Sequence, residues 1–134
     1  MAIEETLAII KPDAVKRNII GVIIKMIEEN GLVIKKMKSY YFTENEAKKF
    51  YEVHKTKAFY DKLVSYMTSG MIIAILIEGE NAITKYRQLI GSTNPDDADE
   101  GTIRKLCAID GRRNSVHGSD SKESAITEIK FFFT

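Results

Sequence analysis

A histidine, His117, stands directly before a glycine and a helix-start signal. Ser119, Asp120 and Ser121 are residue types that cap helix N-termini. Glu123 follows Asp120 by three positions, as in a capping box. Free backbone N–H groups at a helix N-terminus favour an anion, and a neutral imidazole is nucleophilic near neutral pH. The segment therefore predicts a histidine that accepts a phosphate, with a core histidine beside a turn glycine as the alternative.

Other sites of phosphate, metal or acyl chemistry are missing from the sequence. Neither G-x-x-x-x-G-K-[ST] nor G-x-G-x-x-G occurs, which argues against a P-loop or Rossmann site. No cysteine or histidine cluster has zinc spacing, and no G-x-S-x-G marks a hydrolase serine. Cations remain near strand ends and in one loop, among them Lys11, Arg87 and Arg104. Each alone is most often a surface charge, but together they favour an anionic substrate.

The composition is that of a globular domain without a nucleic-acid surface. The chain has 134 residues, 44% hydrophobic and 29% charged, which suits one domain with its own core. The 20 basic and 19 acidic residues give a net charge of +1, whereas a nucleic-acid binder normally has a strong basic excess. We therefore expect a single domain over residues 1–134 and no dedicated nucleic-acid binding.

Cysteine usage and the N-terminal residues bear on the cellular compartment. Cys107 is the single cysteine, so it cannot form an internal disulfide and suits a reducing environment. Glu4 and Glu5 stand where a secretory signal would carry basic residues. No apolar run approaches the roughly 20 residues that cross a bilayer. These features predict a cytoplasmic protein that does not enter a membrane.

The apolar pattern predicts strands and helices in alternation. Short apolar or alternating runs predict strands over residues 6–10, 32–42, 71–77 and 115–118. Helical spacing and capping signals predict helices over residues 20–30, 43–53, 59–68, 81–90 and 121–132. Residues 92–113 have no clear period and contain Pro95, Gly101 and Gly111, which predicts a long functional loop.

The order β-α-β-(αα)-β-α-β-α predicts an α+β fold. It corresponds to a ferredoxin-like split βαβ sandwich, in which a four-stranded antiparallel sheet carries helices on one face. The two consecutive helices in the middle form an inserted helical hairpin. The other face of the sheet would then be free to pair with another subunit.

Six segments make the chain resemble the nucleoside diphosphate kinase family from end to end. In order, they are 10–15 (IKPDAV), 66–70 (YMTSG), 78–82 (EGENA), 91–95 (GSTNP), 101–104 (GTIR) and 113–121 (RNSVHGSDS). The His-Gly-Ser-Asp segment in its flanking context is highly specific to that family. The resemblance implies transfer of the γ-phosphate of a nucleoside triphosphate, typically ATP, to a nucleoside diphosphate.

The resemblance also implies a ping-pong mechanism through a phosphohistidine at His117. Glu128 would hold the other ring nitrogen of the imidazole, although helical spacing alone would leave it a solvated charge. Tyr51 would lie beside His117. The residues assigned to the phosphates and the sugar hydroxyls by resemblance are Lys11, Tyr51, Arg87, Thr93, Arg104 and Asn114.

The resemblance places the base and the metal as well. The base would stack on Phe59, with Leu63 nearby, between the two hairpin helices. Stacking tolerates base identity because every base has a π-face, so broad base and sugar tolerance is expected. Mg²⁺ would bridge the phosphates, and Asp120 would reach it through water, since Mg²⁺ keeps several waters. Asp120 could equally be only a helix cap.

Four positions depart from the common pattern of the family. Ala58, Met71 and Glu100 stand where prolines are frequent, and Gly111 stands where a β-branched residue usually packs against the base. None of these positions touches the expected chemistry. They bear on nucleotide affinity, stability and loop-mediated assembly.

Several alternatives stay open at the level of sequence. A ferredoxin-like regulatory module could bind a nucleotide without turnover, and a protein of this type could also pass its phosphate to histidines of other proteins. The resemblance implies a homo-oligomer built from dimers, but the sequence does not distinguish a tetramer from a hexamer.

Overall fold

The structure is a computed structural model that describes residues 3–110 and 113–133. Within these residues, four antiparallel strands form one sheet in the order β2-β3-β1-β4. The strands are β1 (Ile3–Ile10), β2 (Val33–Tyr40), β3 (Ile72–Glu80) and β4 (Val116–Gly118). Helices connect β1 to β2 and β3 to β4, so the split βαβ order of the ferredoxin-like α+β prediction is confirmed.

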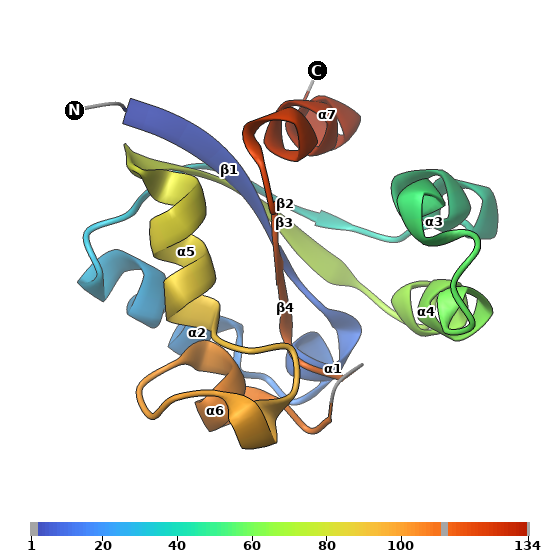
Figure 1. The fold of residues 1–134 in the computed structure, drawn as a ribbon, viewed down its shortest axis with the longest axis horizontal. Helices are drawn as coiled ribbons and strands as arrows, with labels where there is room; N and C mark the ends of the chain where they lie inside the picture. The colour runs from blue at the N-terminus through green and yellow to red at the C-terminus, as the bar shows by residue number, and fades with distance from the viewer. Residues whose placement is uncertain (1–2, 111–112, 134) are drawn as a thin grey trace.

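One face of the sheet is covered by the two crossover helices, α2 (Ile20–Glu29) and α5 (Ala82–Ile90). In Figure 1 they lie on the same side of the strands, with α6 (Ile103–Cys107) below α5. Alternate residues of each strand point to this face, because side chains in a strand alternate between its two sides. The core here is a cluster of buried aliphatic side chains that includes Ile10, Ile23, Ile27, Ile75, Ile77 and Ile90.

The second face is covered in part by the hairpin helices α3 (Glu44–Phe50) and α4 (Tyr60–Met67) and by the C-terminal helix α7 (Lys122–Phe133). Leu7 and Ile9 of β1 pack there with Met67 of α4 and Phe132 of α7. The sheet therefore has two cores, and most of the face that we expected to be free is used within the chain.

The hairpin begins with the capping box predicted at Thr43. Its hydroxyl accepts a hydrogen bond from the backbone N–H of Glu46, and the Glu46 carboxylate accepts one from the Thr43 N–H. The short 3-10 helix η1 (Glu52–His54) follows α3 and leads to α4. This 3-10 helix matters for the site because His54 in it and Tyr51 directly before it both line the cleft.

The prediction of one long loop over residues 92–113 was wrong in part. Two short elements lie in it, the 3-10 helix η2 (Pro95–Asp97) and α6. Asn94 caps the first, and Thr102 caps the second by accepting a hydrogen bond from the Lys105 N–H at 3.3 Å. The apolar pattern did not predict these helices because they contain too few residues to establish an apolar period.

The start of α7 differs from the capping box expected at Asp120 and Glu123. The residue before the helix is Ser121, and its hydroxyl accepts a hydrogen bond from the Ser124 N–H at 3.0 Å. One of the N–H groups that we assigned to an anion is therefore bonded to the chain itself. Cationic side chains, described below, are the anion-attracting groups near His117.

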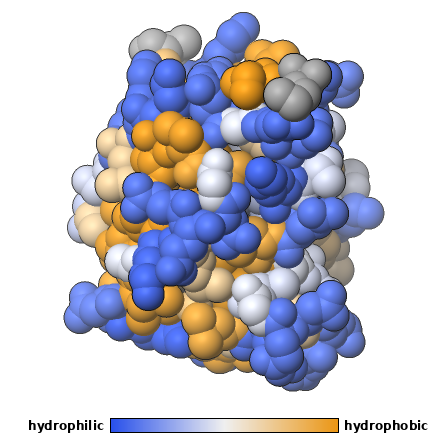
Figure 2. Space-filling model, turned by 90° about the vertical axis from the view of Figure 1, so that its left-hand side faces the viewer, coloured by the Kyte–Doolittle hydropathy of each residue, from blue (hydrophilic) through white to orange (hydrophobic). Residues whose placement is uncertain are grey.

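Figure 2 shows the side of the molecule on which α2, α5 and α6 lie. Apolar side chains form several patches there, and hydrophilic side chains separate them. Within the described residues, none of the helices combines the length and the apolar character needed to span a bilayer.

Candidate active site

A cleft lies where the hairpin, β4 and the start of α7 meet, and it has two adjoining compartments. The first has a volume of ≈ 470 Å³ and the second ≈ 480 Å³. The side chains that line both are Tyr51, His54, Thr93, Arg104 and His117. Arg87, Asp120 and Glu128 line only the first. Lys11, Phe59, Leu63 and Asn114 line only the second.

His117 is at the centre of the cleft, in the short strand β4 opposite Ile9. Its Nε2 lies 2.8 Å from Oε1 of Glu128, and both side chains are 17% exposed. The ring of Phe50 packs edge-on against the imidazole, with 5.7 Å between the ring centroids. The Glu128 contact fixes the ring through one nitrogen, and Nδ1 has no hydrogen-bond partner among the described residues.

Ser119 holds the Glu128 carboxylate in place. Its hydroxyl donates to the same Oε1 at 2.7 Å and accepts from the backbone N–H of Leu7 at 3.2 Å. Ser119 is fully buried. From the sequence we predicted only a helix-capping role for Ser119. In the structure its hydroxyl links Glu128 to strand β1.

Gly118 brings helix α5 close to the histidine. A Cβ atom at this position would lie 2.9 Å from Cδ2 of Tyr86, which is closer than real side chains approach. The close approach lets Arg87, the next residue of α5, donate from Nη1 to the Gly118 carbonyl at 3.2 Å. A guanidinium is thereby held beside His117.

Arg104 of α6 is a second, deeper guanidinium. Nη1 donates to the Gly91 carbonyl at 3.0 Å, and Nη2 donates to the Val116 carbonyl at 2.9 Å. Burial lowers the pKa of Arg104 to about 10, so it remains charged near neutral pH. Because no carboxylate of the described residues pairs with it, its charge is available to an anion in the cleft.

Lys11 lies where β1 ends, at the residue before Pro12 starts α1 (Pro12–Lys16). Its Nζ donates to Oδ1 of Asn114 at 2.8 Å, and only 7% of the residue is exposed. Burial, and then repulsion by Arg104, lower the pKa of Lys11 from 10.5 to about 7. An anion bound in the cleft would favour the charged form again.

Tyr51, at the end of α3, presents a buried hydroxyl to the cleft. The residue is 6% exposed, and its hydroxyl oxygen has no hydrogen-bond partner among the described residues. Burial, with the nearby Glu128 carboxylate, raises the pKa of Tyr51, so the hydroxyl keeps its proton and can donate it in a hydrogen bond. Its ring centroid lies 6.4 Å from that of His117.

The outer end of the second compartment is aromatic. Phe59, the residue before α4, is 45% exposed, and Leu63, one turn later, is buried. The His54 ring lies 5.6 Å from the Phe59 ring and 6.5 Å from the Tyr51 ring, between centroids. An exposed aromatic face beside a buried leucine is a surface on which a flat apolar ring can stack.

Thr93 and Asp120 complete the set predicted from the sequence. The Thr93 carbonyl accepts from Nδ2 of Asn114 at 3.4 Å. Asp120 is exposed at the edge of the first compartment, and a hydrogen bond from Ser124 keeps the pKa of its carboxyl below the usual range. Among the described residues, no group of three or more His, Cys, Asp and Glu side chains is arranged to hold a metal ion.

The cleft thus brings together every side chain that we singled out for catalysis or binding, although they lie far apart in the sequence. The structure adds Ser119, Phe50 and His54, which sequence reasoning missed. Ser119 had a signal, since it is part of the His-Gly-Ser-Asp segment. Phe50 and His54 had none, because their roles depend on which rings the fold places beside them.

Three of the four unusual positions fall on the surface or at an element boundary. Ala58 and Glu100 are exposed, and Met71 is half-buried directly before β3. The start of α4, just after Ala58, has no side-chain cap. Gly111 lies outside the described residues.

A histidine held by a carboxylate, in a cationic cleft with an aromatic mouth, is an arrangement suited to a nucleotide phosphotransferase on a ferredoxin-like fold. Comparison with known proteins agrees with this class. The model of the family described as nucleoside diphosphate kinase matches residues 4–134. The chain therefore belongs to the nucleoside diphosphate kinase family, whose members transfer phosphate between nucleotides.

Individual relatives match over nearly the full chain. The nucleoside diphosphate kinase of Lawsonia intracellularis is 53% identical over 97% of this chain and 94% of its own. That of Bartonella henselae is 53% identical over 100% of this chain and 96% of its own. The crystal structure of the Aquifex aeolicus nucleoside diphosphate kinase superposes with a TM-score of 0.97, at 40% identity, over 99% of this chain and 96% of that one.

Proposed function

We propose that His117 carries the phosphate between two nucleotides as a covalent intermediate. The lone pair of Nδ1 attacks the γ-phosphorus of a nucleoside triphosphate, the bond to the bridging oxygen breaks, and the nucleoside diphosphate leaves with that electron pair. A second nucleoside diphosphate then takes the phosphate by the reverse step. The observation that carries this proposal is the hydrogen bond from His117 Nε2 to Glu128, which directs the other ring nitrogen to the cleft.

In this proposal Glu128 is the residue that orients the imidazole and stabilises the positive charge that develops on it. The Ser119 hydroxyl keeps the carboxylate in place. Tyr51 supports the histidine with its ring and offers its buried hydroxyl to the phosphate. A buried donor without a partner costs free energy, so a phosphate oxygen at that point would satisfy it.

The remaining polar side chains bind the phosphates and the sugar. Phosphoryl transfer requires mainly positioning and stabilisation of spread negative charge. Lys11, Arg87 and Arg104 supply positive charge to the cleft, and Lys11 and Arg104 are largely buried, where electrostatic interactions are stronger than in water. Thr93 and Asn114 line the second compartment with Lys11 and Arg104 and can bond the sugar hydroxyls and phosphates.

Mg²⁺ fits the donor set of the first compartment as a partner of the substrate. Mg²⁺ keeps most of its waters and is commonly bound through one or two carboxylates together with phosphates. Asp120 supplies one carboxylate, ionised at neutral pH and exposed at the rim. When bound, the metal would neutralise phosphate charge, while Asp120 holds it through water.

Two further proposals concern the cellular location of the enzyme and its oligomeric state. The lone buried Cys107 supports a reducing, cytoplasmic location. Val33 and Met37 expose 53% and 49% of their surface on β2, which is an edge strand of the sheet. These exposed apolar side chains support a homo-oligomer of dimers, a tetramer or a hexamer.

Initial-rate kinetics test the mechanism directly. Mixed with ATP, magnesium and a second nucleoside diphosphate, the protein should form the second triphosphate. A covalent relay predicts parallel lines when reciprocal rate is plotted against reciprocal ATP at several diphosphate concentrations. Intersecting lines would mean that both nucleotides bind together, and binding without turnover would indicate a regulatory module instead.

Phe59→Ala should weaken binding of every nucleotide by roughly 1–3 kcal/mol, the usual value of a base–aromatic stack. The reason is the half-exposed Phe59 ring at the mouth of the second compartment. Affinities for adenine, guanine and pyrimidine diphosphates can be measured by calorimetry. Tyr41→Ala, which removes an aromatic ring that is 68% exposed away from the cleft, is the matched control. A loss confined to one base would show that base edges are recognised.

A further inference from the structure

The backbone directly before the candidate nucleophile is in an unusual conformation. Ser115 has φ of +73°, and the Val116 N–H donates to the Asn114 carbonyl at 2.9 Å. A bond between residues two apart around a positive φ is a γ-turn of the rare, strained kind. Serine seldom adopts this region, where the side chain crowds the backbone. A strained turn persists only when its surroundings hold it.

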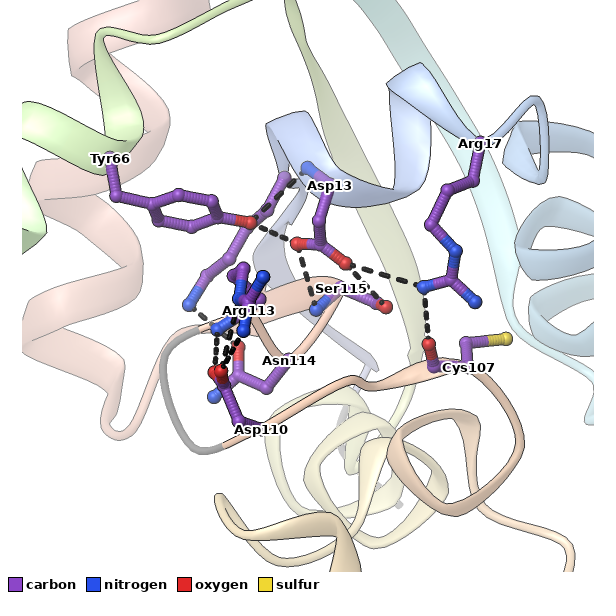
Figure 3. Close-up of polar contacts among 9 residues, drawn as sticks. Asp13, Arg17, Tyr66, Cys107, Asp110, Arg113, Asn114 and Ser115 are labelled. Atoms are coloured by element: carbon purple, nitrogen blue, oxygen red, sulfur yellow. Dashed lines mark hydrogen bonds and ion pairs between the residues drawn. The ribbon is translucent and has the colours of Figure 1, made fainter.

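Asp13 stabilises this turn through hydrogen bonds to Ser115. Its Oδ1 accepts from the Ser115 N–H at 3.3 Å, and its Oδ2 accepts from the Ser115 hydroxyl at 3.0 Å. The Lys11 N–H donates to the Ser115 carbonyl at 2.8 Å. All polar groups of Ser115 are therefore bonded by the segment that follows β1. Figure 3 shows the Asp13 carboxylate facing Ser115.

The same carboxylate joins the turn to the hairpin. The Tyr66 hydroxyl of α4 donates to Asp13 Oδ1, and the Asp13 N–H donates to the Tyr66 oxygen at 3.2 Å. Burial, with this hydrogen bond, raises the pKa of Tyr66, so the donor stays protonated. Arg17 lies 3.7 Å from Asp13 and donates to the Cys107 carbonyl at 2.6 Å. Asp13 is thus where α1, α4, the turn and the end of α6 meet.

We infer that Asp13 is a positioning residue for phosphoryl transfer and acts through the Ser115 turn. Asp13 lines neither compartment of the cleft. The turn, however, positions two residues that do: Asn114 is its first residue, and His117 directly follows it. A misplacement of about 1 Å can slow a reaction by on the order of 10²-fold, so loosening the turn should slow the transfer. This inference rests on the proposed role of His117.

If Asp13 positions the turn, the effect of replacing it should depend on the residue at position 115, whereas a merely stabilising Asp13 would act independently of that residue. Glycine takes a positive φ without strain, so in Ser115→Gly the turn no longer needs the hydrogen bonds to Asp13 to keep its conformation. Ser115→Ala removes the same hydroxyl but keeps the strain. Asp13→Asn retains the size of the side chain but leaves one oxygen to accept from donors that two oxygens accepted before.

The experiment measures single-turnover labelling of His117 by saturating ATP, together with ADP affinity and thermal stability. Asp13→Asn should slow labelling by about 10–100-fold, the scale of a misplaced reacting group. ADP affinity should change by less than about threefold, because base stacking is untouched. In the Ser115→Gly background, the same substitution should slow labelling by no more than about threefold, since the strained turn is gone. Asp61→Asn, an exposed aspartate on α4, is the control and should have no effect.

A second pair of variants keeps the test decisive if Asp13→Asn does not fold. Ser115→Ala should label more slowly than Ser115→Gly, although both lack the hydroxyl. Equal slowing by Asp13→Asn in both backgrounds, or faster labelling of Ser115→Ala, would overturn the inference. If the unsubstituted protein is not labelled on His117 at all, the proposed function falls as well, which distinguishes the two failures.

Discussion

His117→Ala should abolish phosphate transfer. With ATP and magnesium but no acceptor, the unsubstituted protein should gain one phosphate per chain and release ADP, whereas the variant should gain none. Turnover should fall by on the order of 10⁵-fold or more, the scale of removing a covalent nucleophile. A phosphate on an imidazole nitrogen is labile in acid and persists in base, so brief acid treatment should remove the label. Any nucleoside diphosphate should also discharge it.

Nucleotide binding by this variant should largely survive. The proposed contacts to the phosphates and the base come from other side chains, chiefly Lys11, Arg104 and Phe59. His54→Ala is the matched control, because His54 is the other histidine of the chain and also lines the cleft. That variant should still take up the label. Transfer at a comparable rate by His117→Ala, or a label that resists acid, would rule out the covalent histidine mechanism.

Lys11→Met should have the second-largest effect. The substitution keeps the length of the buried side chain but removes its charge. We expect phosphorylation of His117 at neutral pH to fall by about 10²–10³-fold, the usual cost of losing one preorganised donor to the reacting group. Single-turnover labelling measures this rate, and thermal stability should not fall, because the removed ammonium is buried at a cost. Labelling at an unchanged rate would show that Lys11 has no role in phosphorylation of His117.

The lowered pKa of Lys11 gives this prediction a pH dependence with a defined sign. Between pH 7 and 10.5 the folded protein holds fewer protons on this lysine than the unfolded chain does, so stability should rise with pH in that window. Activity should move in the opposite direction. The free enzyme loses the Lys11 charge above pH 7, and kcat/KM, which reports the free enzyme, should decline there.

Calorimetry and a conservative variant check the same assignment. Above the pKa, a bound phosphate should return Lys11 to its charged form, so nucleotide binding should take up a proton from the buffer. Binding enthalpies in buffers of different ionisation enthalpy measure that uptake. Lys11→Arg retains charge at all these pH values, so its kcat/KM should lack the decline above neutral pH. A decline that persists in Lys11→Arg would assign it to another group.

The order of elements was accessible from the sequence because each rests on local patterns. The apolar run of β3 and the capping box at Thr43 are properties of neighbouring residues, and both are found where they were predicted. The short helix α6 was missed because nothing in five residues establishes a period. The coverage of the second face of the sheet was missed for another reason, since it depends on where the hairpin and α7 pack.

The identity of the nucleophile was also available from the sequence. His117 stands in a segment specific enough to imply both the family and the chemistry, and the residues assigned with it all line one cleft. The protonation states of these side chains and the strength of their interactions could not be predicted from the sequence. The lowered pKa of Lys11 comes from burial and from Arg104, which is 93 positions away in sequence but close in space.

The support around the site is what only the tertiary structure decided. In the sequence Asp13 is only one residue of the segment 10–15, and its role follows from the return of the chain 102 positions later to place Ser115 against it. Ser119 likewise reaches Glu128 and Leu7 at once because β1, β4 and α7 converge. Local patterns record the propensities of neighbouring residues. Contacts between distant residues, and the dielectric in which their charges act, exist only once the chain has folded.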